Sequence, residues 1–208
     1  MIASRHPTRT ASRSRRLELM AIAAELFAQR GFANVTVDHI GEAAGVSGPA
    51  LYHHFRGKEA LLGEMLVRIS QHLLDGGNRL TREYPDETLA HLIAFHCEFA
   101  VDDRALITVH FRDLIHALPA DQGSVRRLQA RYVSLWVDAV LARSPSIDRR
   151  TAIAAVHATF GLINSTPFST RLPRARMIEL LSSMATAALD RLDDPDATVG
   201  PRPTTRPS

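Results

Sequence analysis

The chain has a single cysteine and a single lysine among its 208 residues, and it has no run of about 18 apolar residues. Its one cysteine, Cys97, cannot form an internal disulfide or a cysteine-rich zinc site, so packing has to stabilise the fold. The basic start of the chain also lacks the apolar stretch that a secretory signal carries. We therefore expect a soluble, cytoplasmic protein that does not bind membranes.

Motifs of the common enzyme classes are missing as well. The chain contains no P-loop, no GxSxG, no HExxH and no dinucleotide-binding glycine fingerprint. Histidine and cysteine cluster at His91, His96 and Cys97, but spacings of five and one do not place three ligands on one helical face. The prediction is a protein that is not an enzyme and holds no cofactor, with a metal-responsive protein left as an alternative.

Positive charge is concentrated at the N-terminal end. Residues 1–58 contain eight Lys and Arg against four Asp and Glu, whereas the rest of the chain contains 17 against 18. Such an excess favours a polyanionic partner, and nucleic acid is the usual one. A solvated basic tail would have the same composition, so the sequence motifs have to distinguish the two.

Apolar residues recur every three or four positions between the two termini, which predicts an all-α fold. The first helix should run from about residue 12 to residue 30, where Gly31 ends it. Thr36 and Ser47 are suited to begin two short helices, with Gly45 breaking the chain between them.

A longer helix should begin at Lys58 and end at the consecutive glycines Gly76 and Gly77. Prolines separate the helices that follow. The pattern places these helices at about residues 87–101, 104–117, 121–143, 148–165 and 174–192.

The most specific pattern is TVDHIGEAAGVSGPALYHHFRGKEALL, at residues 36–62. It combines a threonine before a short helix, an A-x-G-V-S turn, an L-Y-x-H-F helix and a K-E-x-L-L helix start, and it follows AAELFAQRGF at residues 23–32. Over about residues 15–66 the chain resembles the DNA-binding segment of the TetR family of repressors. The resemblance implies a homodimeric repressor that binds a palindromic double-stranded operator and is released by a small-molecule effector.

The resemblance also implies an organisation into domains. The N-terminal three-helix domain would contain the helix-turn-helix, and a larger helical domain would bind the ligand and dimerise. The predicted segments are a flexible basic tail (1–11), the helix-turn-helix DNA-binding domain (12–57), a connecting helix (58–75), a ligand-binding and dimerisation domain (76–192) and a flexible tail (193–208). An architectural DNA-binding protein without a ligand is a further alternative.

The second short helix is the candidate recognition helix. Leu51 and Phe55 lie four residues apart and should pack inward, which leaves the opposite side for the major groove. Many family members have Lys-Gly where this chain has Gly48-Pro49, so an operator cannot be transferred by analogy. The residues expected to contact DNA are Thr36, Ser47, Gly48, Pro49, Ala50, Tyr52, His53, His54 and Lys58.

These residues have different expected roles. His53 and Tyr52 would hydrogen-bond to bases, and Pro49 and Ala50 would contact thymine methyl groups. The resemblance places Thr36, Ser47, Tyr52, His54 and Lys58 at phosphates, although the first two would serve equally well as helix caps. An N-terminal arm could reach the flanking DNA through Arg5, Arg9, Arg13, Arg15 and Arg16.

The larger domain of TetR-family proteins encloses a ligand cavity, and its last two helices form a four-helix bundle with a partner subunit. Broad apolar faces at residues 148–165 and 174–192 suit that role. The residues expected to line the ligand site are Met65, Phe95, Phe99, Phe111, Trp136 and Phe160, with His110, Arg112 and Asn164 as polar anchors. Each of these aromatic residues is, taken singly, more often ordinary core than a ligand contact. An apolar lining beside an arginine favours a hydrophobic acid or an acyl thioester as the effector.

Overall fold

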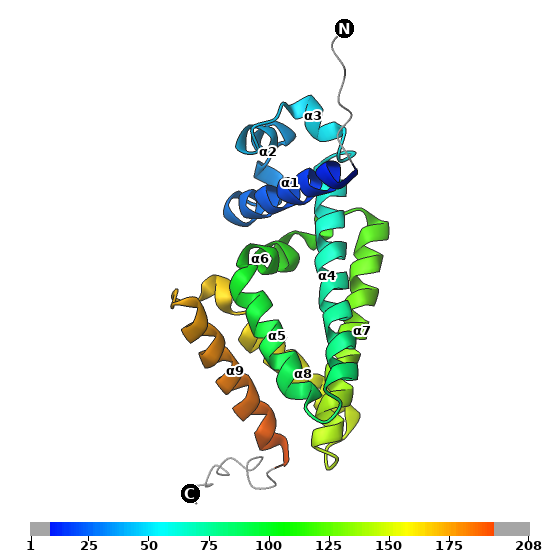
Figure 1. Ribbon diagram of the computed structural model, residues 1–208, viewed down its shortest axis with the longest axis vertical. Coiled ribbons are helices and arrows are strands. Elements are labelled where there is room, and N and C mark those ends of the chain that lie inside the picture. The colour runs from blue at the N-terminus through cyan, green and yellow to red at the C-terminus, as the bar shows by residue number, and fades with distance from the viewer. Residues whose placement is uncertain (1–8, 194–208) are drawn as a thin grey trace, which may run out of the picture. The chain divides into compact units, whose positions relative to one another are not determined.

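The structure, a computed structural model, describes residues 9–193, and over that range the chain is helical without a strand (Figure 1). The α-helices are α1 (Arg9–Arg30), α2 (Val37–Ala43), α3 (Gly48–Tyr52), α4 (Lys58–Glu83), α5 (Thr88–Asp102), α6 (Arg104–Asp113), α7 (Pro119–Arg143), α8 (Arg149–Ile163) and α9 (Arg174–Asp190). Short 3-10 turns follow four of them: η1 (Phe32–Asn34), η2 (Leu114–His116), η3 (Thr166–Phe168) and η4 (Arg191–Asp193). The all-α prediction is confirmed. None of the helices within residues 9–193 is long and apolar enough to cross a membrane.

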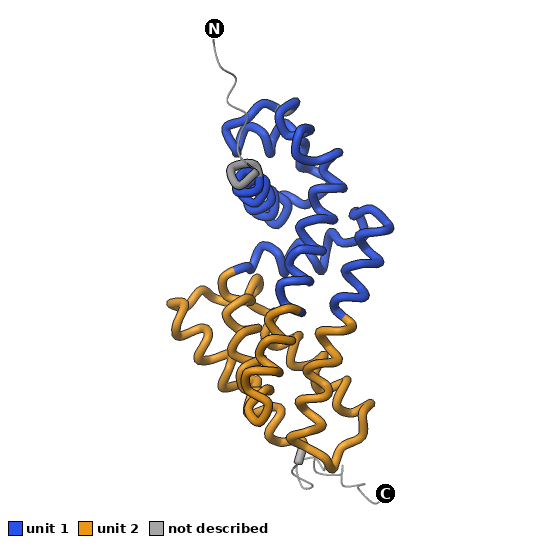
Figure 2. Tube along the Cα trace, turned by 45° about the vertical axis from the view of Figure 1, so that its right-hand side comes forward, with its two compact units in different colours: residues 1–74, 103–129 blue, residues 75–102, 130–208 orange. Residues whose placement is uncertain are grey.

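The chain forms two compact units (Figure 2). Within the described residues, unit 1 consists of residues 9–74 and 103–129, and unit 2 of residues 75–102 and 130–193. Helices α4 and α7 each contribute one segment to either unit. Unit 1 therefore contains α6 and the start of α7 in addition to the first three helices and the start of α4.

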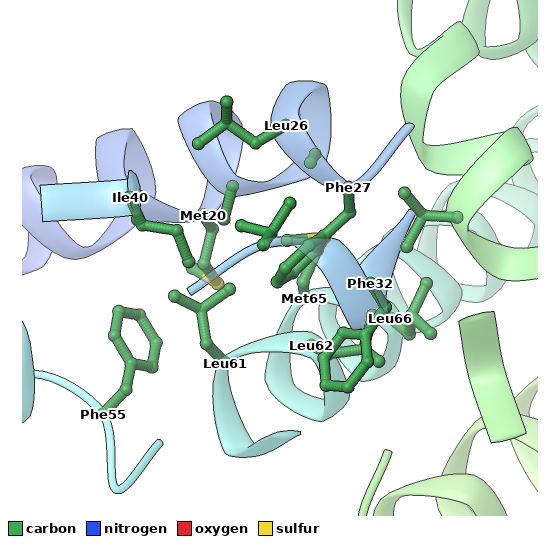
Figure 3. Close-up of a cluster of buried hydrophobic side chains, with 14 of the residues drawn as sticks. Met20, Leu26, Phe27, Phe32, Ile40, Phe55, Leu61, Leu62, Met65 and Leu66 are labelled. Carbon is green, nitrogen blue, oxygen red and sulfur yellow. The ribbon is translucent and has the colours of Figure 1, made fainter. Parts of the chain in front are cut away.

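The core of unit 1 is built from the apolar face of α1 and the residues that the short helices turn toward it (Figure 3). Phe27 of α1 is fully buried, as are Ile40 of α2, Leu51 of α3 and Leu62 of α4. Phe27 and Phe32 pack ring against ring, with centroids 5.2 Å apart. The four helices share one core, so the short α2 and α3 are held by tertiary packing, which isolated helices of seven and five residues need.

The predicted end of the long helix at Gly76 and Gly77 is wrong, because α4 continues through both glycines to Glu83. A Cβ atom on Gly76 would lie 2.3 Å from Cζ of Phe95, and one on Gly77 would lie 2.9 Å from Cδ1 of Leu135. Both residues are buried within unit 2. The glycines therefore allow α5 and α7 to pack closely on α4, and they do not end the helix.

Candidate nucleic-acid interface

Helix α2 begins at a reciprocal cap. The Thr36 hydroxyl accepts a hydrogen bond from the main-chain N–H of His39 (3.1 Å), and Nδ1 of His39 accepts one from the main-chain N–H of Thr36 (3.2 Å). Histidine here takes the place that glutamate or glutamine usually has in a capping box. The capping role predicted for Thr36 is confirmed, and its side chain is exposed at the start of the helix.

The turn between α2 and α3 is closed by main-chain hydrogen bonds. The N–H of Gly45 donates to the carbonyl of Glu42 (3.1 Å), and the N–H of Val46 donates to the carbonyl of Gly41 (2.8 Å), which is a Schellman motif. Gly45 has a φ of 65°, a conformation that side chains disfavour. Gly45 therefore ends α2 as predicted and sets the direction in which α3 leaves the turn.

Helix α3 presents a small outer face. Leu51 and Phe55 are buried, as their spacing predicts, whereas Tyr52 is 60% exposed and Pro49 and His53 are also exposed. Pro49 lies in the first turn, where its missing N–H removes no helical hydrogen bond. Ser47 precedes the helix, and its hydroxyl makes no capping hydrogen bond, unlike that of Thr36.

Two arginines of α1 hold the helix-turn-helix in place. Arg15 donates from Nη2 to the carbonyl of Ala44 in the turn (2.6 Å). Arg16 donates to the main-chain carbonyl of His54 and to the Glu64 carboxylate, and its guanidinium lies 4.2 Å from the centre of the Phe55 ring. These contacts fix both ends of α3 relative to α1.

The charges of these arginines also act on the histidine at the end of α3. His54 is half-buried, and its pKa is lowered by desolvation first and then by the positive charges of Arg16 and Arg15. A neutral imidazole is a weaker phosphate partner than an imidazolium, but its N–H can still donate. The predicted phosphate contact of His54 therefore requires only the neutral ring.

Lys58 is engaged within unit 1. Its Nζ atom donates to the carbonyls of Phe32 (3.0 Å) and Val35 (2.9 Å) and lies 4.3 Å from the centre of the Phe32 ring. The ammonium group has three N–H donors, so these two bonds leave one. The phosphate contact of Lys58 remains a prediction, and the contacts seen here close the loop before α2.

The arginines of the predicted arm do not share one environment. Arg5 lies outside the described residues, Arg9 begins α1, and Arg13 is exposed on that helix. One basic residue was missed: Arg56, which lies in the loop between α3 and α4 and is exposed. The sequence could have indicated it, because Arg56 and Lys58 form a short basic run behind the candidate recognition helix.

The residues predicted to bind a ligand are divided between the two units. Met65, His110, Phe111 and Arg112 belong to unit 1. Met65 is part of the core beneath the short helices, and Phe111 is 65% exposed. Arg112 donates to the carbonyls of Phe27 and Ala28 and pairs with the buried Asp113 carboxylate at 2.9 Å, so its guanidinium joins α6 to α1.

The other predicted ligand residues belong to unit 2. Trp136, Phe160, Phe99 and Asn164 gather around His96, while Phe95 packs against Gly76. His96 itself is buried in unit 2. Over the described length of the chain, no three His, Cys, Asp or Glu side chains form a group that could hold a metal ion.

Comparison with known proteins identifies relatives of the N-terminal segment. Residues 19–65 match the family described as bacterial regulatory proteins, tetR family. The HTH-type transcriptional repressor KstR2 of Rhodococcus jostii is 29% identical over 126 residues, which are 59% of this chain and 62% of that repressor. This alignment therefore covers less than two thirds of its length.

Solved structures extend the similarity to the whole fold. A TetR-family transcriptional regulator from Bordetella parapertussis superposes with a TM-score of 0.74 at 21% identity, covering 90% of this chain and 98% of that one. The transcriptional regulator FadR from Bacillus subtilis, solved in complex with stearoyl-CoA, superposes with a TM-score of 0.60 at 18% identity, covering 86% and 97%. At these identities the superpositions show the fold alone.

Proposed function

We propose that this chain, a DNA-binding transcriptional regulator of the TetR family, is a repressor that binds a palindromic operator as a homodimer and is released by a small hydrophobic effector. In this proposal residues 12–57 form the DNA-binding domain, and residues 76–192 form the domain that binds the effector and dimerises. Residues 58–75 form the helix that connects the two domains. The observation that carries the proposal is the outer face of α3 and of the residue after it, where Pro49, Tyr52 and His53 are exposed, while Leu51 and, beyond the end of the helix, Phe55 are buried.

The exposed face of α3 has the chemistry to read base edges. Tyr52 offers a hydroxyl, His53 offers a ring N–H or an acceptor nitrogen, and Pro49 and Ala50 offer apolar contact to thymine methyl groups. Gly48 at the first position lets the main chain come close to the DNA. With so few polar side chains, we expect direct readout at a small number of base pairs in each half-site.

Phosphate contacts would surround this face. The Ser47 hydroxyl is exposed and makes no capping bond, and Thr36 is exposed at the start of α2. Arg56 adds a positive charge in the loop between α3 and α4, and Lys58 retains one N–H donor. Such contacts orient the protein on the duplex without reading its sequence.

The proposed dimer interface consists of α8 and α9. Besides its buried residues, each helix leaves apolar side chains exposed, including Ile153 on α8 and Leu180 and Met184 on α9. Gly161 of α8 has open space where a Cβ would be. A face of this kind suits close packing of helices from a second copy.

The proposed effector is small and hydrophobic. FadR from Bacillus subtilis, which shares the fold, was solved with stearoyl-CoA, and this supports the acyl thioester over other hydrophobic compounds. Release requires the effector to favour a geometry that fits the operator less well; a hundredfold loss of affinity corresponds to about 2.7 kcal/mol. Arg112, which joins α6 to α1, is a candidate for transmitting that change within unit 1.

The test begins by recovering genomic fragments on the purified protein and measuring binding to the enriched site by fluorescence anisotropy at fixed salt. Tyr52→Ala and His53→Ala should each weaken specific binding by about tenfold or more, because a lost base contact costs roughly 1–3 kcal/mol. Tyr84→Ala, which removes another exposed tyrosine outside the helix-turn-helix, is the control. Unchanged affinity of both α3 variants would refute the assignment of α3 as the reading helix.

A further inference from the structure

Arg16 of α1 contacts two other parts of unit 1 at once. Its Nε atom donates to the Glu64 carboxylate on α4 (2.6 Å), and Nη2 donates to the second oxygen of the same carboxylate. Its Nη1 atom donates to the main-chain carbonyl of His54, and the guanidinium lies 4.2 Å from the centre of the Phe55 ring. One side chain therefore joins α1, α4 and the chain just after α3.

These contacts fix the orientation of the Arg16 guanidinium. Two N–H bonds to one carboxylate form the fork arrangement that arginine makes and lysine cannot, and they set the plane of the group. With the bond to the carbonyl of His54, three of the five N–H donors are engaged. Although Arg16 belongs to the predicted N-terminal arm, these donors are therefore bound within unit 1.

The end of α3 needs a contact from outside because the helix is short. It has five residues, and the N–H groups of His54 and Phe55 donate back to the carbonyl of Leu51 (2.9 Å each). Carbonyls at the end of a helix have no helical N–H from which to accept. Arg16 supplies a donor to the carbonyl of His54 and covers the Phe55 ring, so it anchors this end of α3.

The anchor lies next to the proposed base contacts. Tyr52 and His53 are exposed and directly precede His54. Side chains that bind a partner have to be held within about 0.5 Å of the productive geometry. A shift of the His54 carbonyl would therefore move both side chains away from the base edges that they are proposed to contact.

We propose that Arg16 is a positioning residue for operator recognition: together with Glu64 it holds the end of α3 in the orientation that reads base edges, and it does not bind DNA itself. This inference rests on the proposed function in taking α3 as the helix that enters the major groove. It adds a side chain of α1 to those that determine operator affinity.

Glu64 distinguishes this role from a phosphate contact. Removing a negative charge from a DNA-binding domain normally strengthens binding to a duplex, because repulsion of the phosphates is reduced. If Arg16 bound a phosphate, neutralising Glu64 would also free the guanidinium for the DNA. If Arg16 positions α3, neutralising Glu64 should weaken operator binding, so the two roles predict opposite signs.

The first test is Glu64→Gln in the full chain, measured by fluorescence anisotropy on the operator and on an unrelated duplex of the same length. Glutamine keeps the shape of the side chain but places an amide NH₂ group where a carboxylate oxygen accepted a bond. We expect operator affinity to fall by about fivefold or more, because bonds between charged groups are the stronger ones, and affinity for the unrelated duplex to stay within about twofold.

The control for this variant is Glu25→Gln, which removes the same charge from an exposed position of α1. It should not weaken operator binding. Unchanged or tighter operator binding of Glu64→Gln would overturn the proposal, and so would an equal loss in the control.

Arg16 itself is tested with lysine and glutamine. Lysine keeps the charge but cannot form the fork, so both Arg16→Lys and Arg16→Gln should lower operator affinity by about fivefold or more. The slope of log K against log salt concentration should not change, whereas loss of a phosphate contact would reduce it by about one. The control is Arg30→Gln, which removes the same charge from the exposed last residue of α1. Full affinity of Arg16→Lys, or a reduced slope in Arg16→Gln, would overturn the positioning role.

The anchoring can also be measured without DNA. Amide hydrogen exchange at His54 and Phe55 should be faster in Arg16→Gln than in Arg30→Gln, because the end of α3 loses its anchor. Circular dichroism shows whether each variant is folded. If Arg16→Gln does not fold, Glu64→Gln, which keeps one acceptor for the arginine, is used for this measurement with Glu25→Gln as its control. Equal exchange rates in variant and control would overturn the proposal.

The two proposals fail in different ways. A wild-type chain that prefers no duplex would refute the proposed function, whatever the exchange rates are. A chain whose operator binding is lost in Tyr52→Ala but kept in Glu64→Gln and Arg16→Lys retains the proposed function and refutes the positioning role.

Discussion

Three arginine side chains of unit 1 donate to main-chain carbonyls of other elements. Arg15 binds the carbonyl of Ala44, Arg16 that of His54, and Arg112 those of Phe27 and Ala28. Guanidinium has five N–H donors in a fixed fork, so one side chain can hold a carbonyl and a carboxylate together, as Arg16 and Arg112 do. In this unit these arginines therefore stabilise the fold in addition to adding positive charge.

At the same scale, His96 should make stability depend on pH. Its pKa is about 4 in the folded chain and about 6.5 in the unfolded chain, so between these values the unfolded state binds more protons. The free energy of unfolding should fall as the pH drops from about 6.5 to about 4, by about 3 kcal/mol in total for this residue. Urea unfolding at fixed protein concentration over this pH range measures the slope.

The variant His96→Phe, which keeps an aromatic ring beside Trp136 and Phe160, should reduce that slope. The control is His116→Phe, at an exposed histidine whose ring stacks on Phe32 with centroids 4.9 Å apart. If His96→Phe and the wild-type chain lose stability equally on acidification, the buried neutral histidine is not the cause.

At the scale of the element, replacing a glycine within a helix can raise or lower stability, depending on which atoms face the glycine. Gly76 and Gly77 of α4 face aromatic and leucine side chains at distances that leave no room for a methyl group. Gly123 of α7 faces only the end of the Arg127 side chain, with Nη1 3.3 Å from a Cβ built there. Alanine has a better helix propensity than glycine, so steric space determines the sign of a substitution.

We expect Gly76→Ala to lower the free energy of unfolding by about 1–2 kcal/mol, because the added methyl group would overlap the Phe95 ring at 2.3 Å. Gly123→Ala should raise it by about 0.5–1 kcal/mol, because the flexible arginine can move. Thermal and urea unfolding measure both variants. A neutral or stabilising Gly76→Ala would show that α4 and α5 are packed less closely than described.

At the scale of the whole molecule, function is proposed to require two copies of the chain. A single helix-turn-helix contacts one half-site, whereas a symmetric pair contacts two half-sites about one helical turn apart and so multiplies affinity and specificity. The apolar side chains exposed on α8 and α9 would be covered in such a pair. Dimerisation and operator binding should therefore be lost together.

We expect Met184→Glu to produce a monomer with a folded circular dichroism spectrum and operator affinity reduced at least tenfold, because a charge in an apolar interface stays unpaired. Light scattering after size exclusion measures the mass. The control is Leu118→Glu, since Leu118 and Met184 are both 47% exposed and Leu118 belongs to unit 1. A dimeric Met184→Glu variant would contradict the assignment of the interface to α9.

Much of the fold and of the proposed DNA-binding helices α2 and α3 could be predicted from local features of the sequence. Gly31, Thr36 and Gly45 end or begin helices where their conformational preferences predicted, and the spacing of Leu51 and Phe55 predicted which side of α3 is buried. These are short-range effects of backbone conformation, capping and periodicity, and residues a few positions apart determine them. For the same reason the motif at residues 36–62 was sufficient to indicate the family whose description residues 19–65 match.

Contacts between residues far apart in the sequence determined the features that these local signals could not predict. The apolar pattern could not show that Gly76 and Gly77 face rings and leucine side chains from α5 and α7, that Arg112 reaches the end of α1, or that His96 is buried beside Trp136 and Asn164. In each case the partner lies on another helix, many residues away in sequence. Composition and periodicity indicate which face of a helix is apolar, but only the packing of several helices determines which side chains from distant parts of the chain become neighbours.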